Sequence, residues 1–264
     1  MKRVLITGGP SNEYIDEVMK ITNMSSGKIA IELAKYFVED GYMVHLLLTK
    51  NIKSPVLDAL NKQDNFALMR FETTEELLNN IYTCSNMMQY DVIIHSAAVA
   101  DYKPAYSFRL EDMATEIADK LSQCSQLGAM TTQSMADIVL EILKNPDCKV
   151  NDSTKISSCE PNLTVKLGLT PKIIESLRKL FPKAFICGFK LLENVSEEEL
   201  VDAAMKQIKR CNTNLVFAND LAKLREGQAA RLVVTPSGYN NIKVDGAYGI
   251  FNLVKIATEE VDDN

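Results

Sequence analysis

The chain has 264 residues, of which 46% are hydrophobic, so it can bury the core of a large α/β domain, and a disordered or fibrous protein is excluded. Its formal net charge is -6 without a run of five like charges, which argues against nucleic acid or a membrane surface as a partner. The six cysteines lack metal-ligand spacing, no apolar run approaches the roughly 20 residues that span a bilayer, and no leader pattern precedes the first strand. We therefore expect a cytoplasmic protein with reduced cysteines.

Short runs rich in Val, Ile and Leu alternate with amphipathic stretches along most of the chain. This alternation predicts βαβ units and an α/β fold of the Rossmann-like, doubly wound type with a mostly parallel sheet. The expected strands are residues 3–7, 43–49, 66–71, 90–96, 184–189, 215–218 and 231–235.

Several helices between these strands have recognisable ends. After Lys28, apolar residues at helical spacing predict a helix that ends at Gly41. Thr-x-x-Glu at 73–76 and Ser-x-x-Glu at 196–199 each fit a capping box at a helix start.

The alternation breaks down between about residues 104 and 168. This region holds charged helical patterns, a polar stretch and the short strand-like run "LTVKLG". We therefore expect one nucleotide-binding domain over residues 1–264, with an inserted flap or small subdomain at about 104–168.

A long loop, Gly8 to Ser26, leads from the first strand to the first helix. Its glycines lack the G-x-G-x-x-G spacing, and its end does not match G-x-x-x-x-G-K-[ST]. Ser25 or Ser26 can cap the helix, while Gly27 and Lys28 offer an open backbone and a positive charge, so the tetrapeptide predicts an anion site. The alternative is an ordinary capped helix with a solvent-facing lysine.

Three further segments follow predicted strands, at the edge where open α/β sheets bind ligands. "HSAAVADY" offers small residues and Asp101, although a tightly packed turn would use the same residues. "GFKLLEN" and "VFANDL" place Lys190 and Asn219 at this edge. The two histidines, His45 and His95, fall within apolar strands and are interpreted as core residues.

Two other functions remain open at this point. Tyr239 and Lys243 form Y-x-x-x-K, the pair of short-chain dehydrogenases, but that chemistry needs a helix, and the segment "TPSGYNNIKVDG" predicts a turn between strands. A reductase of this kind that uses NAD(P) is one alternative, and a non-catalytic nucleotide-binding module is the other.

Six segments together resemble the phosphopantothenoylcysteine synthetase family, also called phosphopantothenate-cysteine ligases. They occur in the family's order and extend from about residue 3 to about residue 235. The segments are "ITGGPSNEYID", "ITNMSSGKIA", "SAAVADY", "KISS" with "LTVKLGLTPKII", "GFKLLEN" and "LVFAND".

The resemblance implies a homodimeric ligase of coenzyme A synthesis that joins 4'-phosphopantothenate to L-cysteine by way of an acyl-nucleotidate. It implies that a nucleoside triphosphate, CTP or ATP, and Mg²⁺ take part, and it assigns no metal ligand. Asn23 would serve the acyl intermediate and Lys155 would meet the triphosphate. The residues expected to bind nucleotide are Gly8, Gly9, Ser25, Ser26, Gly27, Lys28, Ala97, Asp101, Phe189, Lys190 and Asn219, and those expected to bind substrate are Asp16, Asn23 and Lys166.

The chain departs from the family pattern at three places. Lys155 is followed by Ile-Ser-Ser where many bifunctional bacterial relatives have further lysines, and Met19 stands where the family often has arginine. "GFKLLE" is closer to eukaryotic and short monofunctional members, and no flavin-binding half is visible. We therefore expect ligation only, with CTP favoured over ATP.

Overall fold

The computed structural model of the chain describes residues 1–126, 129–150, 155–228 and 230–262. The chain forms two compact units. The large unit comprises Met1–Ser11, Thr22–Ala100 and Pro171–Asn264, and the small unit comprises Asn12–Ile21 and Asp101–Thr170. The small unit thus takes in the region of the expected flap and, in addition, a piece of the loop before the first helix.

The large unit is built on one long sheet. Its strands, in the order in which they pair, are β13 (Gly238–Val244), β12 (Arg231–Thr235), β11 (Leu215–Asp220), β10 (Phe185–Leu192), β6 (Val92–His95), β1 (Arg3–Gly8), β4 (Met43–Thr49) and β5 (Phe66–Phe71). All pairs from β11 to β5 are parallel, while β12 and β13 pair antiparallel. The predicted Rossmann-like, mostly parallel α/β fold is confirmed.

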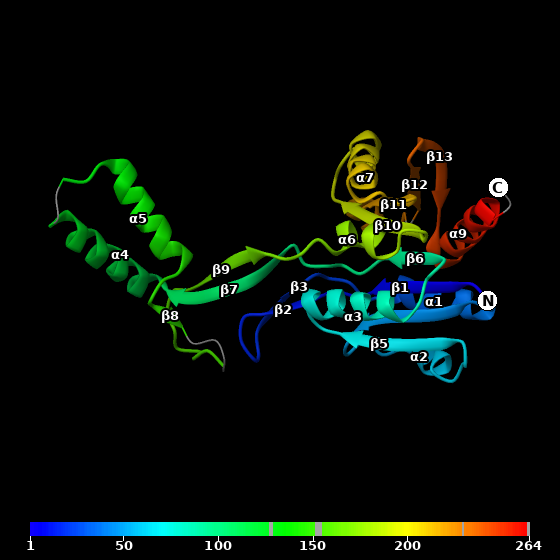
Figure 1. Cartoon of the computed structure of the whole chain (residues 1–264), viewed down its shortest axis with the longest axis horizontal. Helices are drawn as coiled ribbons and strands as arrows, with labels where there is room; N and C mark the ends of the chain where they lie inside the picture. The colour runs from blue at the N-terminus through cyan, green and yellow to red at the C-terminus, as the bar shows by residue number, and fades with distance from the viewer. Residues whose placement is uncertain (127–128, 151–154, 229, 263–264) are drawn as a thin grey trace. The chain divides into compact units, whose positions relative to one another are not determined.

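Helices cover both faces of this sheet (Figure 1). They are α1 (Lys28–Glu39), α2 (Pro55–Leu60), α3 (Thr74–Met87), α6 (Ile173–Leu180), α7 (Glu197–Cys211), α8 (Leu221–Arg225) and α9 (Gly246–Asp262). Helices α1, α2 and α9 share a core with one face of the sheet, and α3, α6 and α7 pack on the other face. Burying the apolar stripes of these six packed helices supplies the main favourable free energy of the fold.

The chain reverses its direction across the sheet at β1. From β1 it proceeds through β4 to β5 at one edge, and it then returns to β6 on the other side of β1 to build the second half. Ligands of open α/β sheets bind outside the carboxyl ends of the strands at such a switch point.

The predicted helix starts are confirmed only in part. At α7, Ser196 and Glu199 form the reciprocal capping box. At α3, Thr73 accepts the Glu76 N–H, but the Glu76 carboxylate accepts the N–H of Glu72 instead of that of Thr73, so the second capping box is wrong. Strand β5 leads directly into this helix and brings the Glu72 N–H within reach of Glu76.

The predicted turn between strands is confirmed only at Pro236 and Ser237, because the rest of the segment, with Tyr239, forms strand β13. A register shift between Leu232 and Val234 and the positive φ of Asn241 let turn-type residues sit within this strand.

The small unit has its own antiparallel sheet. Its strands pair in the order β8 (Lys149–Val150), β7 (Tyr102–Arg109) and β9 (Leu163–Leu169). Helices α4 (Leu110–Ser125) and α5 (Thr132–Lys144) lie side by side and pack on the sheet through Tyr106, Phe108, Met113 and Ile142 (Figure 1). The strands β2 (Asn12–Tyr14) and β3 (Lys20–Thr22) pair as a hairpin, and β2 contacts β7.

Candidate functional site

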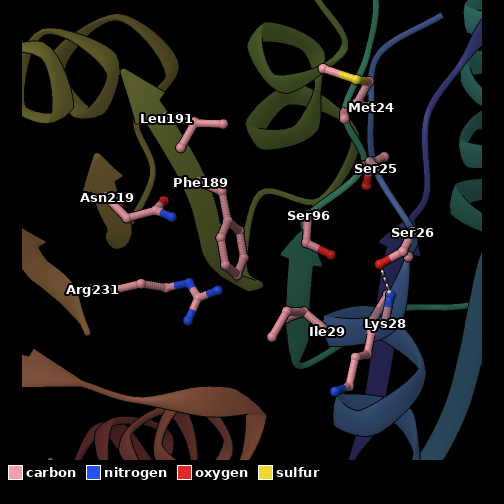
Figure 2. A pocket seen from close by; sticks show the side chains of 14 residues that line it. Met24, Ser25, Ser26, Lys28, Ile29, Ser96, Phe189, Leu191, Asn219 and Arg231 are labelled. Atoms are coloured by element: carbon pink, nitrogen blue, oxygen red, sulfur yellow. Dashed lines mark hydrogen bonds between the residues drawn. The ribbon is translucent and has the colours of Figure 1, made fainter. Parts of the chain in front are cut away.

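A pocket of about 420 Å³ opens in the large unit at the carboxyl ends of its strands (Figure 2). The start of α1, the segment after β6, and the ends of β10, β11 and β12 provide its walls. The lining residues are Met24, Ser25, Ser26, Gly27, Lys28, Ile29, Ala30, Ser96, Ala97, Ala98, Phe189, Leu191, Asn219 and Arg231. The pocket therefore lies at the switch point that the topology defines.

The start of α1 presents free backbone amides to this pocket. Gly27 is the N-cap, with φ of 68°, and as a glycine it has no side chain that could cap the helix. The predicted cap at Ser25 or Ser26 is therefore wrong, and the Ser26 hydroxyl only accepts a long bond from the Lys28 N–H at 3.4 Å. The first-turn N–H groups have no acceptor within the helix, so they form, with the helix dipole, an anion site.

Lys28 adds a positive charge at this helix start. Its side chain is 75% exposed, and its ammonium lies 3.7 Å from the Glu32 carboxylate, one turn along α1. An exposed pair of this kind contributes little stability, so the ammonium can exchange Glu32 for an anionic ligand at small cost.

The opposite wall, after β6, is fixed by Thr7 in β1. The Thr7 hydroxyl accepts the Ala97 N–H at 3.3 Å and contacts His95 Nδ1 at 2.8 Å, and Ser96 donates to the Thr7 carbonyl. His95 is buried, and burial lowers its pKa to about 4. It is neutral near pH 7 and positions the wall, as the core interpretation of this histidine predicts; His45, buried beside Tyr90, also matches that interpretation.

Asn23 lies next to the lining residue Met24 and is exposed. Its Nδ2 donates to the Ala98 carbonyl at 3.1 Å, which ties the loop before α1 to the segment after β6. The second N–H of this amide and its oxygen remain available for further bonds, since each side-chain amide has two donors and an acceptor.

Two of the three residues predicted on β10 and β11 reach the pocket. Phe189 and Asn219 line it, and Figure 2 shows both side chains directed toward its interior. Lys190 does not line it, because successive side chains of a strand point to opposite faces and Lys190 lies between the lining residues Phe189 and Leu191.

Gly8 and Gly9 lie just behind the lining residues, and packing explains why they are glycines. A Cβ at Gly8 would lie 2.2 Å from the Cβ of Ala30, and one at Gly9 would lie 2.4 Å from Thr49 Oγ1. The absence of a side chain at Gly8 lets α1 approach β1 closely, and at Gly9 it leaves room for Thr49 and Ile52.

Four lining residues were not expected from the sequence to belong to a site: Arg231, Leu191, Ile29 and Met24. Arg231 is the first residue of β12, and its side chain extends toward the pocket from that strand (Figure 2). Its signal in the sequence is weak, because an arginine at the start of a strand is common at sheet edges.

The small unit holds the remaining predicted residues. Asp16, 4% exposed, accepts the N–H groups of Val18 and Met19 at 2.7 and 2.6 Å and that of Ile156 at 2.9 Å. These bonds, from Met19 first, lower the pKa of Asp16, and Lys155 lowers it further. The carboxylate thus joins the β2–β3 turn to the segment beside Lys155, which is a structural role within the small unit.

Lys155, Lys166 and Asp101 occupy three different surroundings in this unit. Lys155 is exposed, next to Ile156. The Lys166 ammonium donates to the Leu143 carbonyl at 2.9 Å and lies 4.9 Å from the centre of the Tyr106 ring. Both contacts stabilise the small unit itself. Asp101 is exposed, and its carbonyl accepts the Thr170 N–H where the two chain segments enter the unit.

The helical geometry of the dehydrogenase pair does not form. Tyr239 and Lys243 lie on strand β13 and not on a helix, and the Lys243 ammonium pairs with Glu197 at 2.8 Å. The reductase alternative therefore lacks the geometry that it requires.

Mg²⁺ takes oxygen ligands, among them one or two carboxylates from the protein. Among residues 1–126, 129–150, 155–228 and 230–262, no three His, Cys, Asp or Glu side chains cluster as metal ligands. The described lining of the pocket offers hydroxyl and amide oxygens and two cations but no carboxylate. These residues do not fit a resident metal site; Mg²⁺ that accompanies a triphosphate is held largely by the phosphates and water.

The large unit is a Rossmann-like α/β domain. Its pocket at the switch point combines an amide-rich helix start, two cations and an aromatic ring, groups that suit an anionic, nucleotide-sized ligand. In the part of the chain that the structure describes, no helix is both long and apolar enough to cross a membrane.

Comparisons with known proteins agree with this class. The family model of the DNA/pantothenate metabolism flavoprotein C-terminal domain matches residues 1–142, and the chain belongs to this family. The coenzyme A biosynthesis bifunctional protein CoaBC of Thermococcus kodakarensis is 34% identical over 220 residues, which cover 83% of this chain and 41% of that protein. The chain thus spans less than half the length of such curated relatives.

Solved structures show the same fold. The DNA/pantothenate metabolism flavoprotein of Streptococcus pneumoniae superposes with a TM-score of 0.73 at 27% identity, over 99% of this chain and 100% of that one. A mutant of Cab2, solved in complex with phosphopantothenate-cysteine, superposes with a TM-score of 0.65 at 18% identity, over 99% of this chain and 86% of that one.

Proposed function

We propose that the chain is a ligase that joins 4'-phosphopantothenate to L-cysteine through an acyl-nucleotidate, with CTP as the favoured nucleotide and ATP as the alternative. The observation that supports this most directly is the pocket at the switch point, where the first-turn amides of α1, Lys28 and Arg231 surround space without a carboxylate in its described lining. The relatives in coenzyme A biosynthesis and the Cab2 complex with phosphopantothenate-cysteine favour the same reaction.

The first step would form a bond between a carboxylate oxygen of phosphopantothenate and the α-phosphorus, while the bond from that phosphorus to the bridging oxygen breaks and pyrophosphate leaves. A carboxylate is ionised at neutral pH and needs no general base. Both histidines are buried in structural contacts, which suits a reaction that needs charge neutralisation rather than proton abstraction. The helix-start amides and Lys28 would stabilise the negative phosphate oxygens.

In the second step the cysteine amine would attack the acyl carbon, the bond from that carbon to the nucleotide would break, and the amine would lose a proton. Negative charge grows on the acyl oxygen in this step. The Asn23 amide has an N–H beyond the one bound to Ala98, and it could donate to that oxygen. Lys155 stays in the proposal as a contact of the triphosphate, on the resemblance alone. The homodimer and the cytoplasmic location also stay predictions.

The test is pyrophosphate release with a panel of triphosphates, in the presence of phosphopantothenate, cysteine and magnesium, with amide formation followed by mass spectrometry. We expect turnover with CTP that depends on both substrates. Nucleotide binding without pyrophosphate release would favour the non-catalytic module, and turnover with ATP but not CTP would overturn the choice of nucleotide.

A further inference from the structure

One row of side chains crosses the rim of the pocket on three neighbouring strands. The parallel pairing of β10 and β11 puts Leu191 beside Asn219. The antiparallel register of β11 and β12 pairs Ala218 with Leu232, and one step further along it Asn219 lies opposite Arg231. Residues opposite each other on one face have Cβ atoms about 5 Å apart, so the amide and the guanidinium can bind one planar group together.

Burial makes this pair unusual. Asn219 and Arg231 are each only 8% exposed, yet both line the pocket. Burial lowers the pKa of Arg231, and the charge of Asp245 offsets part of this effect. The guanidinium carries five N–H donors in a planar fork, so at the wall of the pocket it can donate to a planar ligand group with adjacent acceptors.

The place of the row in the sheet indicates which part of a nucleotide it meets. The phosphate site is the start of α1, which packs over β1, whereas β6, β10 and β11 separate β1 from β12. At about 4.8 Å per strand the span from β1 to β12 is roughly 19 Å, too far for one phosphate group to reach both ends. With the phosphates at α1, the base lies toward Arg231, where the Phe189 ring offers a stacking surface (Figure 2).

The hydrogen-bonding groups of the row suit cytosine better than adenine. Guanidinium only donates, in a planar fork, while the asparagine amide both donates and accepts. Cytosine presents two adjacent acceptors, O2 and N3, followed by an amino donor, which match the Arg231 fork and the Asn219 oxygen. Adenine presents one acceptor beside its amino group, and this edge pairs with an asparagine amide alone.

We propose that Arg231, together with Asn219, reads the base of the nucleotide and that Arg231 selects cytosine over adenine. This inference rests on the proposed function, because it assigns a specificity residue to that site.

The test compares Arg231→Lys, Arg231→Gln and the wild type, with CTP and ATP measured separately by calorimetry without phosphopantothenate and by pyrophosphate release with all substrates. Lysine keeps the charge and the stem but loses the fork. We expect the preference for CTP to fall about ten- to a hundredfold in both variants, through weaker CTP binding, while ATP binding changes little. Arg210→Gln, an exposed arginine on α7 that pairs with Glu175, should keep the wild-type ratio.

A ratio between the two nucleotides separates recognition from folding, since a poorly folded variant loses both nucleotides equally. Equal losses for CTP and ATP, or a wild type that binds ATP as tightly as CTP, would overturn the inference. CTP binding that depends on Arg231 in a wild-type protein that forms no amide would support base reading and overturn the proposed ligase function alone.

Discussion

In the large unit, Lys28, Asn219 and Arg231 come from three different elements and line one pocket, whereas in the small unit Asp16 and Lys166 bind the backbone of their own unit. Apart from Arg231, which was not predicted, these residues were expected from the same resemblance. What separates them is where their polar atoms are used: the exposed Lys28 ammonium has a carboxylate 3.7 Å away, that of Glu32, while Asp16 accepts three backbone N–H groups.

The contrast has a physical origin. Pocket residues are placed by strand register and by a helix start, so their side chains are positioned without using up their own donors and acceptors. In the small unit, with only a short sheet and a pair of helices to bury, individual polar contacts fix the irregular segments. A charged residue within a family motif is therefore a weaker sign of ligand binding there than at the pocket.

The largest effect is expected for Asn23→Ala, which tests the pocket side of the comparison. The acyl-nucleotidate should still form, but its capture by cysteine should slow about a hundred- to a thousandfold, because the acyl oxygen loses a donor. Quenched-flow assays should show one rapid release of pyrophosphate per site followed by slow amide formation. Asn61→Ala, at the exposed end of α2, is the control, and unimpaired amide formation in Asn23→Ala would remove Asn23 from the mechanism.

Two lysines of the small unit give the next test, because they carry the same charge in different surroundings. Lys155→Ala should slow pyrophosphate release by up to about a hundredfold if this ammonium meets the triphosphate. Lys166→Ala should leave the rate near that of the wild type and lower the free energy of unfolding by about 1 kcal/mol, since it removes the bond to Leu143 and the contact with Tyr106. Equal losses of rate in both variants would return Lys166 to the substrate site.

Much of the large unit could be predicted because its strands are continuous apolar runs. Strands β4, β5 and β12 begin and end at the predicted residues. Strand β13 was missed because its glycine and asparagines serve an irregular register, which no local pattern reveals. In the small unit, β7 contains Lys103 and Pro104 and gains its order from pairing with β9, a contact distant in sequence.

The same reasons limit prediction of the site. Strand ends gave Phe189 and Asn219, but the expectation for Lys190 overlooked the alternation of side chains along β10. Arg231 could not be found without the register that sets it opposite Asn219, since that pairing depends on the antiparallel return of β12.

Gly8 and Gly27 sharpen the comparison within the large unit itself. Gly8→Ala should destabilise the protein by about 1 to 3 kcal/mol or more, because the new methyl would meet Ala30 at 2.2 Å. Gly27→Ala should cost about 1 kcal/mol from its left-handed φ of 68°, and it should in addition weaken nucleotide binding. Thermal unfolding and calorimetric titration with CTP separate the two effects, and weaker binding by a fully folded Gly8→Ala would place Gly8 in the site as well.

The smallest effect is expected for Asp16→Asn, which tests the structural role assigned in the small unit. The asparagine oxygen can still accept from Val18 and Met19, but its NH₂ cannot accept from Ile156, so the variant removes one bond and the charge beside Lys155.

In the wild type the folded pKa of Asp16 lies below its unfolded value of about 3.9. Its stabilising effect is therefore complete above that value and is lost as the pH falls through the folded pKa. The unfolding free energy of the wild type should thus decrease more steeply between about pH 5 and pH 2 than that of Asp16→Asn, in parallel urea titrations. Asp58→Asn, an exposed residue in α2, should retain the wild-type slope. If Asp16→Asn also retained that slope while losing affinity for phosphopantothenate, Asp16 would be a substrate ligand, and the contrast between the two units would not hold at this residue.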